Sequence, residues 1–526
     1  MEARGPVPKR TKFTAPKIQE VLPSREALDA PSHGPHPSAH NQQPPPGVGE
    51  DEESSDRISN LPDAILGEIV SRLPTNQGAR TQILAPRWRH IWSSAPLSID
   101  CEGLPADNEV LAGIVSRTVS SHPPPCRRFC VPSCFLGDRA STVDEWLRTP
   151  ALDNLQELEF WFKPYYRPQP LQHPPPSSIF RFSATLCVAT IGNCNLPDST
   201  VQGLHFPLLK QLGLELVSIS ECSLHSLIAS FPALECLLIS HGFGFRCLRI
   251  NSLTLRSFAV KNYRKGNDQL KELIVENAPC LQRLLHLDFD YGLHISVVSA
   301  PKLETIGCLS DGFYISKEDD LSRLVFGSTV IQGLRVDRLT TVVHTVKNLA
   351  VNMKILSLDT VIELMRCFPC LEKIYIEVKI LHLFIAFKCS FDLLTELKWL
   401  VSICHVLFQS ESKKEKNVRG RRRQNLTKCP NIRLKTIVFE CYEGIKSVME
   451  FASFFVLNAT VLELMILQIG ARDYNEQFLA EQRRKLQLEN RASRGARFHF
   501  TTDKCARGVW DVHHVRDLDL TDPFVY

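Results

Sequence analysis

The segment Phe206-Pro-Leu-Leu-Lys-Gln-Leu-Gly-Leu214 contains a phrase that recurs along most of the chain. In this phrase a small or aromatic residue and a proline precede a leucine, and further hydrophobic residues follow at alternating positions. The phrase returns at Phe231–Ile239, Ala300–Cys308 and Phe368–Ile376, and in a weaker form at Ala278–Leu284. Alternation with a period of two predicts a short strand with one buried face. Because proline cannot continue a helix, it predicts the end of a helix before each strand.

The spacing of the phrase indicates a repeat protein. With one hydrophobic anchor chosen per phrase, successive anchors lie 18 to 31 residues apart. These gaps cluster near 24, inside the period of about 20–29 residues of leucine-rich repeats, whose turns bury their leucines against neighbouring turns. A domain of buried parallel strands stays open as an alternative. The anchors are Leu155, Leu186, Leu209, Leu234, Leu255, Leu281, Leu303, Ile331, Met353, Leu371 and Leu394.

Composition and charge narrow the class of protein. The chain has 526 residues, of which 44% are hydrophobic and 22% are charged, which excludes disorder throughout and predicts several domains or a repeat array. The formal net charge of +4 gives no general attraction for nucleic acid or anionic membranes. The 18 cysteines are scattered and residues 1–10 lack an apolar signal core, so we expect reduced cysteines and a location in the nucleus, the cytoplasm or both. The most apolar runs are broken by polar residues, which predicts no membrane span.

Two segments depart from the repeat pattern. Residues 1–54 are rich in proline and have no hydrophobic period, so we expect a disordered leader. Residues 409–426 form a basic insert, for which nuclear import and simple solvation are equal alternatives. Nucleic-acid binding ranks below both, because no aromatic residues interleave the charges. The charges of this insert are Lys413, Lys414, Lys416, Arg419, Arg421, Arg422 and Arg423.

Residues 55–100 predict a small unit of three helices ahead of the repeats. The first helix follows Pro62, the second covers Thr75–Leu84, and the third begins at Pro86, because proline is tolerated only in the first turn. Gly78, inside the second helix, costs about 0.5–1 kcal/mol relative to alanine. A unit this small buries little apolar surface, so a partner is expected to cover part of it. The apolar stripe of the first helix is Ile65, Leu66, Ile69, Val70 and Leu73.

The segment Asp56–Trp92 closely resembles a plant-type F-box. The resemblance depends on Leu61-Pro-Asp63, Ala79-Arg-Thr81 and Arg87-Trp-Arg-His-Ile-Trp92, which occur together and in this order. Further along, residues 427–526 resemble the FBD module that often follows in the same plant proteins. The matching stretches are Cys429–Phe439, Met449–Ala452 and Asn458–Glu463.

This resemblance implies a complete architecture and a function. The fold is an α/β leucine-rich-repeat solenoid, or horseshoe, over residues 120–408, preceded by the three-helix F-box and continued by the FBD module. The function is the substrate-recognition subunit of a Skp–cullin–F-box ubiquitin ligase. The F-box binds a Skp-type adaptor, and through it a cullin, and the repeat and FBD surface binds an unidentified protein target. The candidate adaptor-binding residues are Leu61, Pro62, Ile65, Leu66, Ile69, Leu73, Arg80 and Trp88.

Competing readings of the same residues remain. The apolar residues of the first helix either meet the adaptor or form the core of a free unit. The chain has no phosphate loop, metalloprotease motif or nucleophile elbow, so we expect no catalytic residue and no cofactor. Two cysteine groups have spacings that a metal could use, but buried repeat cysteines explain them better, so no metal is expected. A non-degradative scaffold, and a receptor whose repeat concavity holds a small ligand, are the functional alternatives. The two groups are Cys126, Cys130 and Cys134, and the pair Cys367 and Cys370.

Overall fold

The computed structural model divides the chain into two compact units, Met1–Asn60 and Leu61–Tyr526. The expected leader, residues 1–54, and the basic insert, residues 409–426, lie outside the described residues. The structure describes residues 58, 60–102, 104, 107–121, 125–161, 173–262, 270–287, 292–311, 321–353, 356–378, 432–440, 442–471, 474–502 and 512–519.

Three short α-helices open the second unit. They are α1 (Asp63–Ser71), α2 (Thr75–Arg80) and α3 (Pro86–Ser94), with the 3₁₀-helix η1 (Thr81–Ile83) between the last two. Pro86 occupies the first turn of α3, where its missing N–H costs no hydrogen bond. The buried core that these helices share consists of Leu66, Val70, Trp88, Ile91 and Ala95.

Gly78 is needed for packing rather than being a weak point of α2. A Cβ atom at this position would lie 2.4 Å from Cζ3 of Trp92, well inside van der Waals contact. Glycine lowers the helix propensity of α2, but its lack of a side chain lets α2 and α3 approach each other closely. The sequence indicated the cost but gave no sign of the neighbouring ring.

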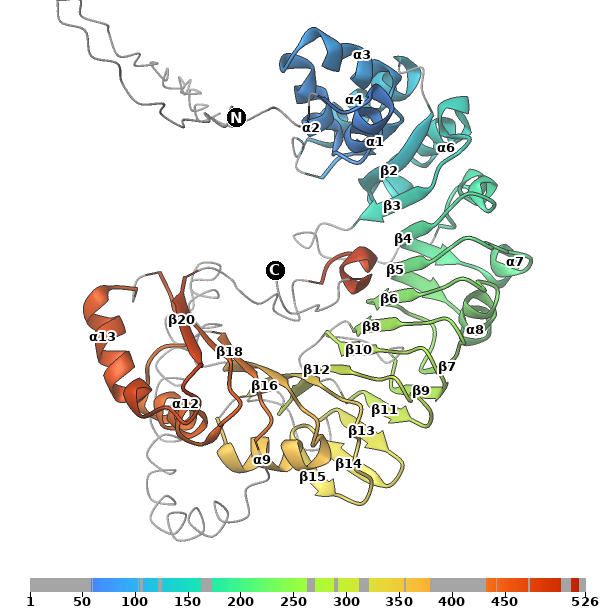
Figure 1. Cartoon of the computed structure of the whole chain (residues 1–526). Helices are drawn as coiled ribbons and strands as arrows, with labels where there is room; N and C mark the ends of the chain where they lie inside the picture. Colours follow the sequence, from blue (N-terminus) through green and yellow to red (C-terminus); the bar gives the residue numbers. More distant parts are fainter. Residues whose placement is uncertain are drawn as a thin grey trace, which may run out of the picture. The chain divides into compact units, whose positions relative to one another are not determined.

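A 14-stranded sheet forms the body of the unit, and every neighbouring pair in it is parallel. Figure 1 shows these strands following one another along the chain. In order across the sheet they are β1 (Leu97–Asp100), β2 (Cys126–Pro132), β3 (Glu157–Trp161), β4 (Val188–Leu196), β5 (Gln211–Ile219), β6 (Cys236–Ser240), β8 (Ser257–Lys261), β10 (Arg283–His286), β12 (Thr305–Ser310), β16 (Asn348–Met353), β17 (Lys373–Val378), β18 (Thr436–Glu440), β19 (Leu464–Gln468) and β20 (Arg497–Thr501).

The recurring sequence phrase produces these strands as predicted. Leu209, Leu234 and Leu303 are buried and each stands two residues before a strand, at β5, β6 and β12. Alternate residues of each strand then enter the same continuous core, as Leu212 and Leu214 do in β5. The parallel α/β class and the repeated burial of leucine therefore follow from the phrase.

A second layer covers one face of the sheet, and it differs from the prediction in the middle of the chain. Between β6 and β16 the segments that precede the strands of the main sheet are themselves strands rather than helices. An extended strand advances about 3.3 Å per residue and a helix about 1.5 Å, so the shortest turns can return only by extended chain. These strands form a six-stranded sheet of β7 (Cys247–Asn251), β9 (Glu272–Asn277), β11 (His294–Val297), β13 (Arg323–Phe326), β14 (Thr329–Gln332) and β15 (Arg335–Arg338).

Helices supply this layer in the turns on either side of the six-stranded sheet. The longer ones are α4 (Asn108–Ser121), α6 (Ala140–Arg148), α8 (Glu221–Ala229), α9 (Leu358–Cys367), α12 (Lys446–Asn458) and α13 (Glu476–Lys485). The short ones are α5 (Phe135–Asp138), α7 (Asp198–Val201), η2 (Pro150–Leu152), η3 (Ser177–Phe182) and η5 (Leu488–Asn490). One further 3₁₀-helix, η7 (Val515–Asp519), belongs to the opposite face of the main sheet. The described helices include none that is both long and apolar enough to cross a membrane.

Two of the sequence anchors are wrong. Ile331 belongs to β14 of the second sheet, and Met353 ends β16 instead of preceding it. The buried residue two positions before β16 is Val346. The antiparallel strands β14 and β15 lengthen this turn, and glycines with positive φ, Gly327 and Gly333, stand at the two bends. The anchor Leu394 lies outside the described residues.

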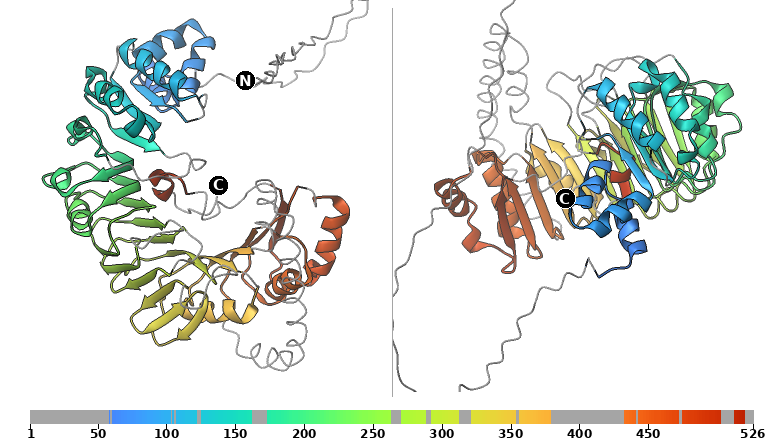
Figure 2. Two further views of the ribbon diagram at one scale, coloured as in Figure 1. Left: turned by 180° about the vertical axis from the view of Figure 1, so that it is seen from behind. Right: turned by 90° about the horizontal axis from the view of Figure 1, so that it is seen from above.

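The C-terminal segment 512–519 lies on the face of the main sheet opposite to the second layer. Val512, Val515 and Leu518 are buried there in a separate cluster with Leu238 and Ala259. Figures 1 and 2 both show the short dark-red helix η7 beside the strands and away from α7 and α8. This face of the sheet is therefore partly occupied by the chain itself.

Candidate protein-docking surface

The apolar stripe of α1 divides into a buried and an exposed half. Leu66 has 0% of its surface exposed and packs with Val70 against α3. Ile65 and Ile69, on the neighbouring edge of the helix, are 49% and 43% exposed. The unit thus closes its own core without these two isoleucines, which are left as apolar surface.

The other candidate residues take different places. Trp88 is buried with Leu66 in the core, so neither side chain lies on the surface of the unit. Leu61 is half-buried against the same core, and Leu73 is also half-buried. Pro62 and Arg80 are exposed.

Two exposed residues that the sequence reasoning missed lie at the end of η1. Ile83 is 82% exposed and Leu84 is 65% exposed. They fall in a segment predicted only as part of a second helix, and a helical pattern alone does not say which side is covered. The sequence does contain a signal that at least one of them is exposed, because two aliphatic residues adjacent on a helix cannot both face one small core.

Polar contacts hold the start of α1 against α3. The side chain of Arg87 pairs with Asp63, with 2.6 Å between Nε and Oδ1, and donates a hydrogen bond of 2.6 Å to the carbonyl of Leu61. Because these groups are exposed, the ion pair orients the Leu61–Asp63 segment and adds little to stability. The hydroxyl of Thr75 donates to the carbonyl of Ser98 and accepts from the N–H of Asp100, so α2 is tied to β1.

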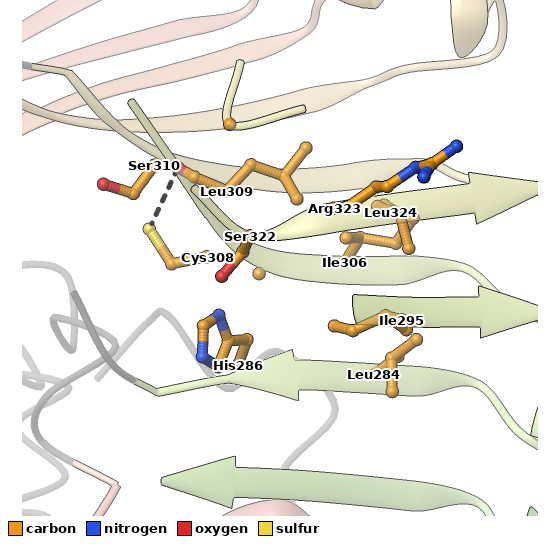
Figure 3. A pocket seen from close by; sticks show the side chains of 12 residues that line it. Leu284, His286, Ile295, Ile306, Cys308, Leu309, Ser310, Ser322, Arg323 and Leu324 are labelled. Atoms are coloured by element: carbon orange, nitrogen blue, oxygen red, sulfur yellow. Dashed lines mark hydrogen bonds between the residues drawn. The ribbon is translucent and has the colours of Figure 1, made fainter. Parts of the chain in front are cut away.

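A cavity lies between the two sheets, and Figure 3 shows the residues around it. Its volume is about 20 Å³, room for about one water molecule. His286, at its edge, is buried, and burial lowers its pKa to about 4, so the ring is neutral at pH 7. Such a cavity is too small for an organic ligand.

The cysteine groups behave as core residues. Burial raises the pKa of Cys126 to about 12 and that of Cys367 to about 11, so neither thiol ionises at neutral pH to act as a nucleophile. Cys130 is also buried, and Cys134 and Cys370 are half-buried. Within the described ranges, no three His, Cys, Asp or Glu side chains are grouped closely enough to hold a metal ion.

Comparisons with known proteins assign the two main parts of the chain. A family model described as the leucine-rich repeats of FBD-associated F-box protein At5g56370 matches residues 143–376. The FBD family model matches residues 423–467, in agreement with the resemblance at the C-terminal end.

Curated relatives from Arabidopsis thaliana agree with these family models. F-box/FBD/LRR-repeat protein At1g13570 is 26% identical over 52% of this chain and 66% of its own length. FBD-associated F-box protein At5g56370 is 32% identical over 34% of this chain and 42% of its own length. F-box/LRR-repeat protein At5g02910 is 49% identical over 10% of this chain and 12% of its own length.

These alignments are partial, and the chain spans between 38% and 67% of the length of the relatives that it matches over more than 180 residues. Together with the parallel sheet, the two family models agree with the residues quoted for the repeats and the FBD module. The chain therefore carries the leucine-rich repeats of FBD-associated F-box proteins and an FBD domain, and it is similar to F-box/FBD/LRR-repeat proteins of Arabidopsis thaliana.

Proposed function

We propose that this chain is the substrate-recognition subunit of a Skp–cullin–F-box ubiquitin ligase and that it has no catalytic role of its own. Helices α1–α3 hold a Skp-type adaptor, and through it a cullin. The main sheet, continued as a horseshoe solenoid, and the FBD module hold a protein target. Ubiquitin transfer is then accelerated by proximity, because the target is kept beside the transfer machinery.

The observation that carries this proposal is the exposed aliphatic surface of the helical unit. Ile65, Ile69, Ile83 and Leu84 remain exposed although the unit has a core of its own. Large apolar side chains left in water on so small a unit favour a surface that a partner covers. The protein would be found in the nucleus, the cytoplasm or both, and residues 409–426 are the candidate import signal.

The test is affinity purification from plant cells in which the proteasome is blocked. We compare the full chain with the double variant Ile83→Ala, Leu84→Ala, which removes exposed aliphatic atoms without touching the core. Adaptor and cullin are expected to co-purify with the intact chain and to fall at least tenfold in the variant, while target proteins remain with both. The matched control is Leu253→Ala, another exposed leucine, at 68%, outside the helical unit.

Two results would contradict the proposal. Equal recovery of adaptor with the intact chain and the double variant would exclude this surface. Recovery of no adaptor with the intact chain would favour the alternative function of a scaffold that holds its target without degradation.

A further inference from the structure

Three carboxylates gather around one arginine on the face of the main sheet opposite to the second layer. Arg128 of β2 lies between its neighbours β1 and β3. Its guanidinium nitrogens lie 3.0 Å from Oδ2 of Asp100, 3.4 Å from Oε2 of Glu157 and 2.9 Å from Oε1 of Glu159. The parallel register places these side chains in adjacent rows, because Arg128 pairs with Glu157 and Cys130 pairs with both Asp100 and Glu159.

This cluster has more negative than positive charge. Three carboxylates against the single guanidinium of Arg128 leave a net charge of −2. Arg127 adds little, because its Nε lies 4.0 Å from Glu157 and its Nη1 lies 2.9 Å from Glu68. Burial raises the pKa of Glu157 and of Glu159 in spite of the neighbouring arginine. A second cation at this position would therefore remove an electrostatic cost.

The C-terminal segment supplies that cation. Arg516 pairs with Glu157, and its Nη2 lies 2.5 Å from Oε1 of Glu159. His514 approaches the same cluster, with Nε2 3.7 Å from Glu102 and Nδ1 3.8 Å from Oε2 of Glu159. The segment thus behaves as a ligand of the sheet that is covalently attached to it.

Apolar contacts anchor the same segment farther along the sheet. Val515 and Leu518 are buried on Leu238 and its neighbours, and Nη1 of Arg283 donates a hydrogen bond of 3.2 Å to the carbonyl of Leu518. A peptide therefore meets two features on this face, an acidic cluster that pairs with one arginine and an apolar strip beside it.

The fit of Arg516 is incomplete. Oε2 of Glu159, a residue only 1% exposed, has no hydrogen-bond donor, and the buried Nε of Arg516 has no acceptor among the described residues. A buried polar atom without a partner costs free energy, and an arginine can satisfy both oxygens of a carboxylate with two parallel N–H groups. The acidic cluster can therefore form one more hydrogen bond with an arginine than Arg516 provides.

We propose that the acidic cluster of Asp100, Glu157 and Glu159 is a recognition site for an arginine in the protein target, and that residues 512–519 occupy it until the target displaces them. The target class is a peptide segment in which an apolar residue stands two positions after an arginine, as in Arg516-Asp-Leu518. The inference rests on the proposed function only in taking the bound protein to be the target of the ligase. Because the attached segment acts at an effective concentration in the millimolar range, a target must bind better than Arg516 does.

The experiment uses a fluorescent peptide with the sequence Val512-His-His-Val-Arg-Asp-Leu-Asp519, titrated with the full-length protein. The wild-type protein is compared with the variant Val515→Asp, Arg516→Ala, whose attached segment no longer fits. We expect the peptide to bind the variant with a Kd at least tenfold lower than for the wild type. Adding Glu157→Gln to the variant should raise the Kd of the peptide at least tenfold again. Replacing the arginine of the peptide by lysine should also raise the Kd at least tenfold, because a lysine cannot pair with two carboxylate oxygens in parallel.

Controls separate the possible failures. Arg249→Ala removes an exposed ion pair with Glu276 on the second sheet and should leave peptide binding at the wild-type value. Circular dichroism checks that each variant is folded. Equal binding to the wild type and the released variant, or binding that survives Glu157→Gln, would overturn the inference. Adaptor binding is measured on the same samples, so that a failure of the peptide is distinct from a failure of the proposed function.

Discussion

Replacing Arg128 by methionine is expected to lower the free energy of unfolding by about 3–5 kcal/mol at pH 7. Methionine keeps most of the volume of the side chain but removes the charge that lies within 3.4 Å of Asp100, Glu157 and Glu159. The three carboxylates would then repel one another in a site where little water screens them. Denaturant unfolding of the full chain measures the loss, and Arg249→Met, at an exposed ion pair, serves as the control with a change below about 1 kcal/mol.

The loss should depend on pH in a defined direction. The pKa values of Glu157 and Glu159 are raised in the folded state, mainly by burial, and removal of Arg128 raises them further. A carboxyl with a raised folded pKa contributes stability that is fully present below its unfolded pKa, about 4.3, and lost as the pH rises through the folded pKa. The deficit of Arg128→Met should therefore shrink as the pH falls from 7 towards 4.5. A deficit that stays constant or grows on acidification would contradict this electrostatic account.

Replacing Leu66 by alanine should cost about 3 kcal/mol, the usual price of a leucine-sized cavity. The core of the helical unit has few members, so this loss is expected to unfold α1–α3 while the main sheet persists. Hydrogen exchange of α1–α3, compared with that of β4–β6, would detect such local unfolding. Ile65→Ala is the matched control, because its side chain is half-exposed on the same helix and its loss should change protection little.

Protection of α1–α3 in Leu66→Ala at the wild-type level would contradict this division of the stripe into core and surface. The comparison also separates folding from docking. A variant that loses the adaptor because α1–α3 unfold gives no information about the docking surface, whereas an exposed variant that stays folded does.

The repeat phrase was enough to predict the parallel sheet, because burial and strand geometry are both local. Leu209, Leu234 and Leu303 take the expected positions, and the phrase alone specifies them. Ile331 and Met353 were misplaced because a regular spacing was assumed where two antiparallel strands had been inserted. A hydrophobic residue at the right interval does not reveal to which sheet it belongs.

The division of the stripe on α1 could not be predicted from sequence. Ile65 and Leu66 differ by one position on the helix, and which of the two is covered depends on where Trp88 and Ile91 pack. The same is true of Gly78, whose role depends on the ring of Trp92 in another helix. Contacts between elements settle these questions, and helical periodicity does not.

The contact of residues 512–519 with the main sheet was not predicted at all. Arg516 lies 359 positions from Glu157, and an isolated basic residue near the end of a chain has no pattern of its own. The sequence does contain one unusual pattern, in which Glu157 and Glu159 alternate with buried leucine and phenylalanine on a single strand. Two acids on one face of a buried strand require a cation, but the sequence does not say which one.

The central claim is that the exposed isoleucines of α1 bind the adaptor. The most direct test is isothermal titration calorimetry, in which a purified plant Skp-type adaptor is titrated into the full-length protein. The wild type is compared with Ile65→Ala, Ile69→Ala, two half-exposed side chains whose loss leaves the core of α1–α3 intact. At about 1.5 kcal/mol for each truncated interface side chain, the adaptor should bind on the order of a hundredfold more weakly, with an unchanged melting temperature. A Kd equal to that of the wild type, in a folded double variant, would contradict the claim that this surface holds the adaptor.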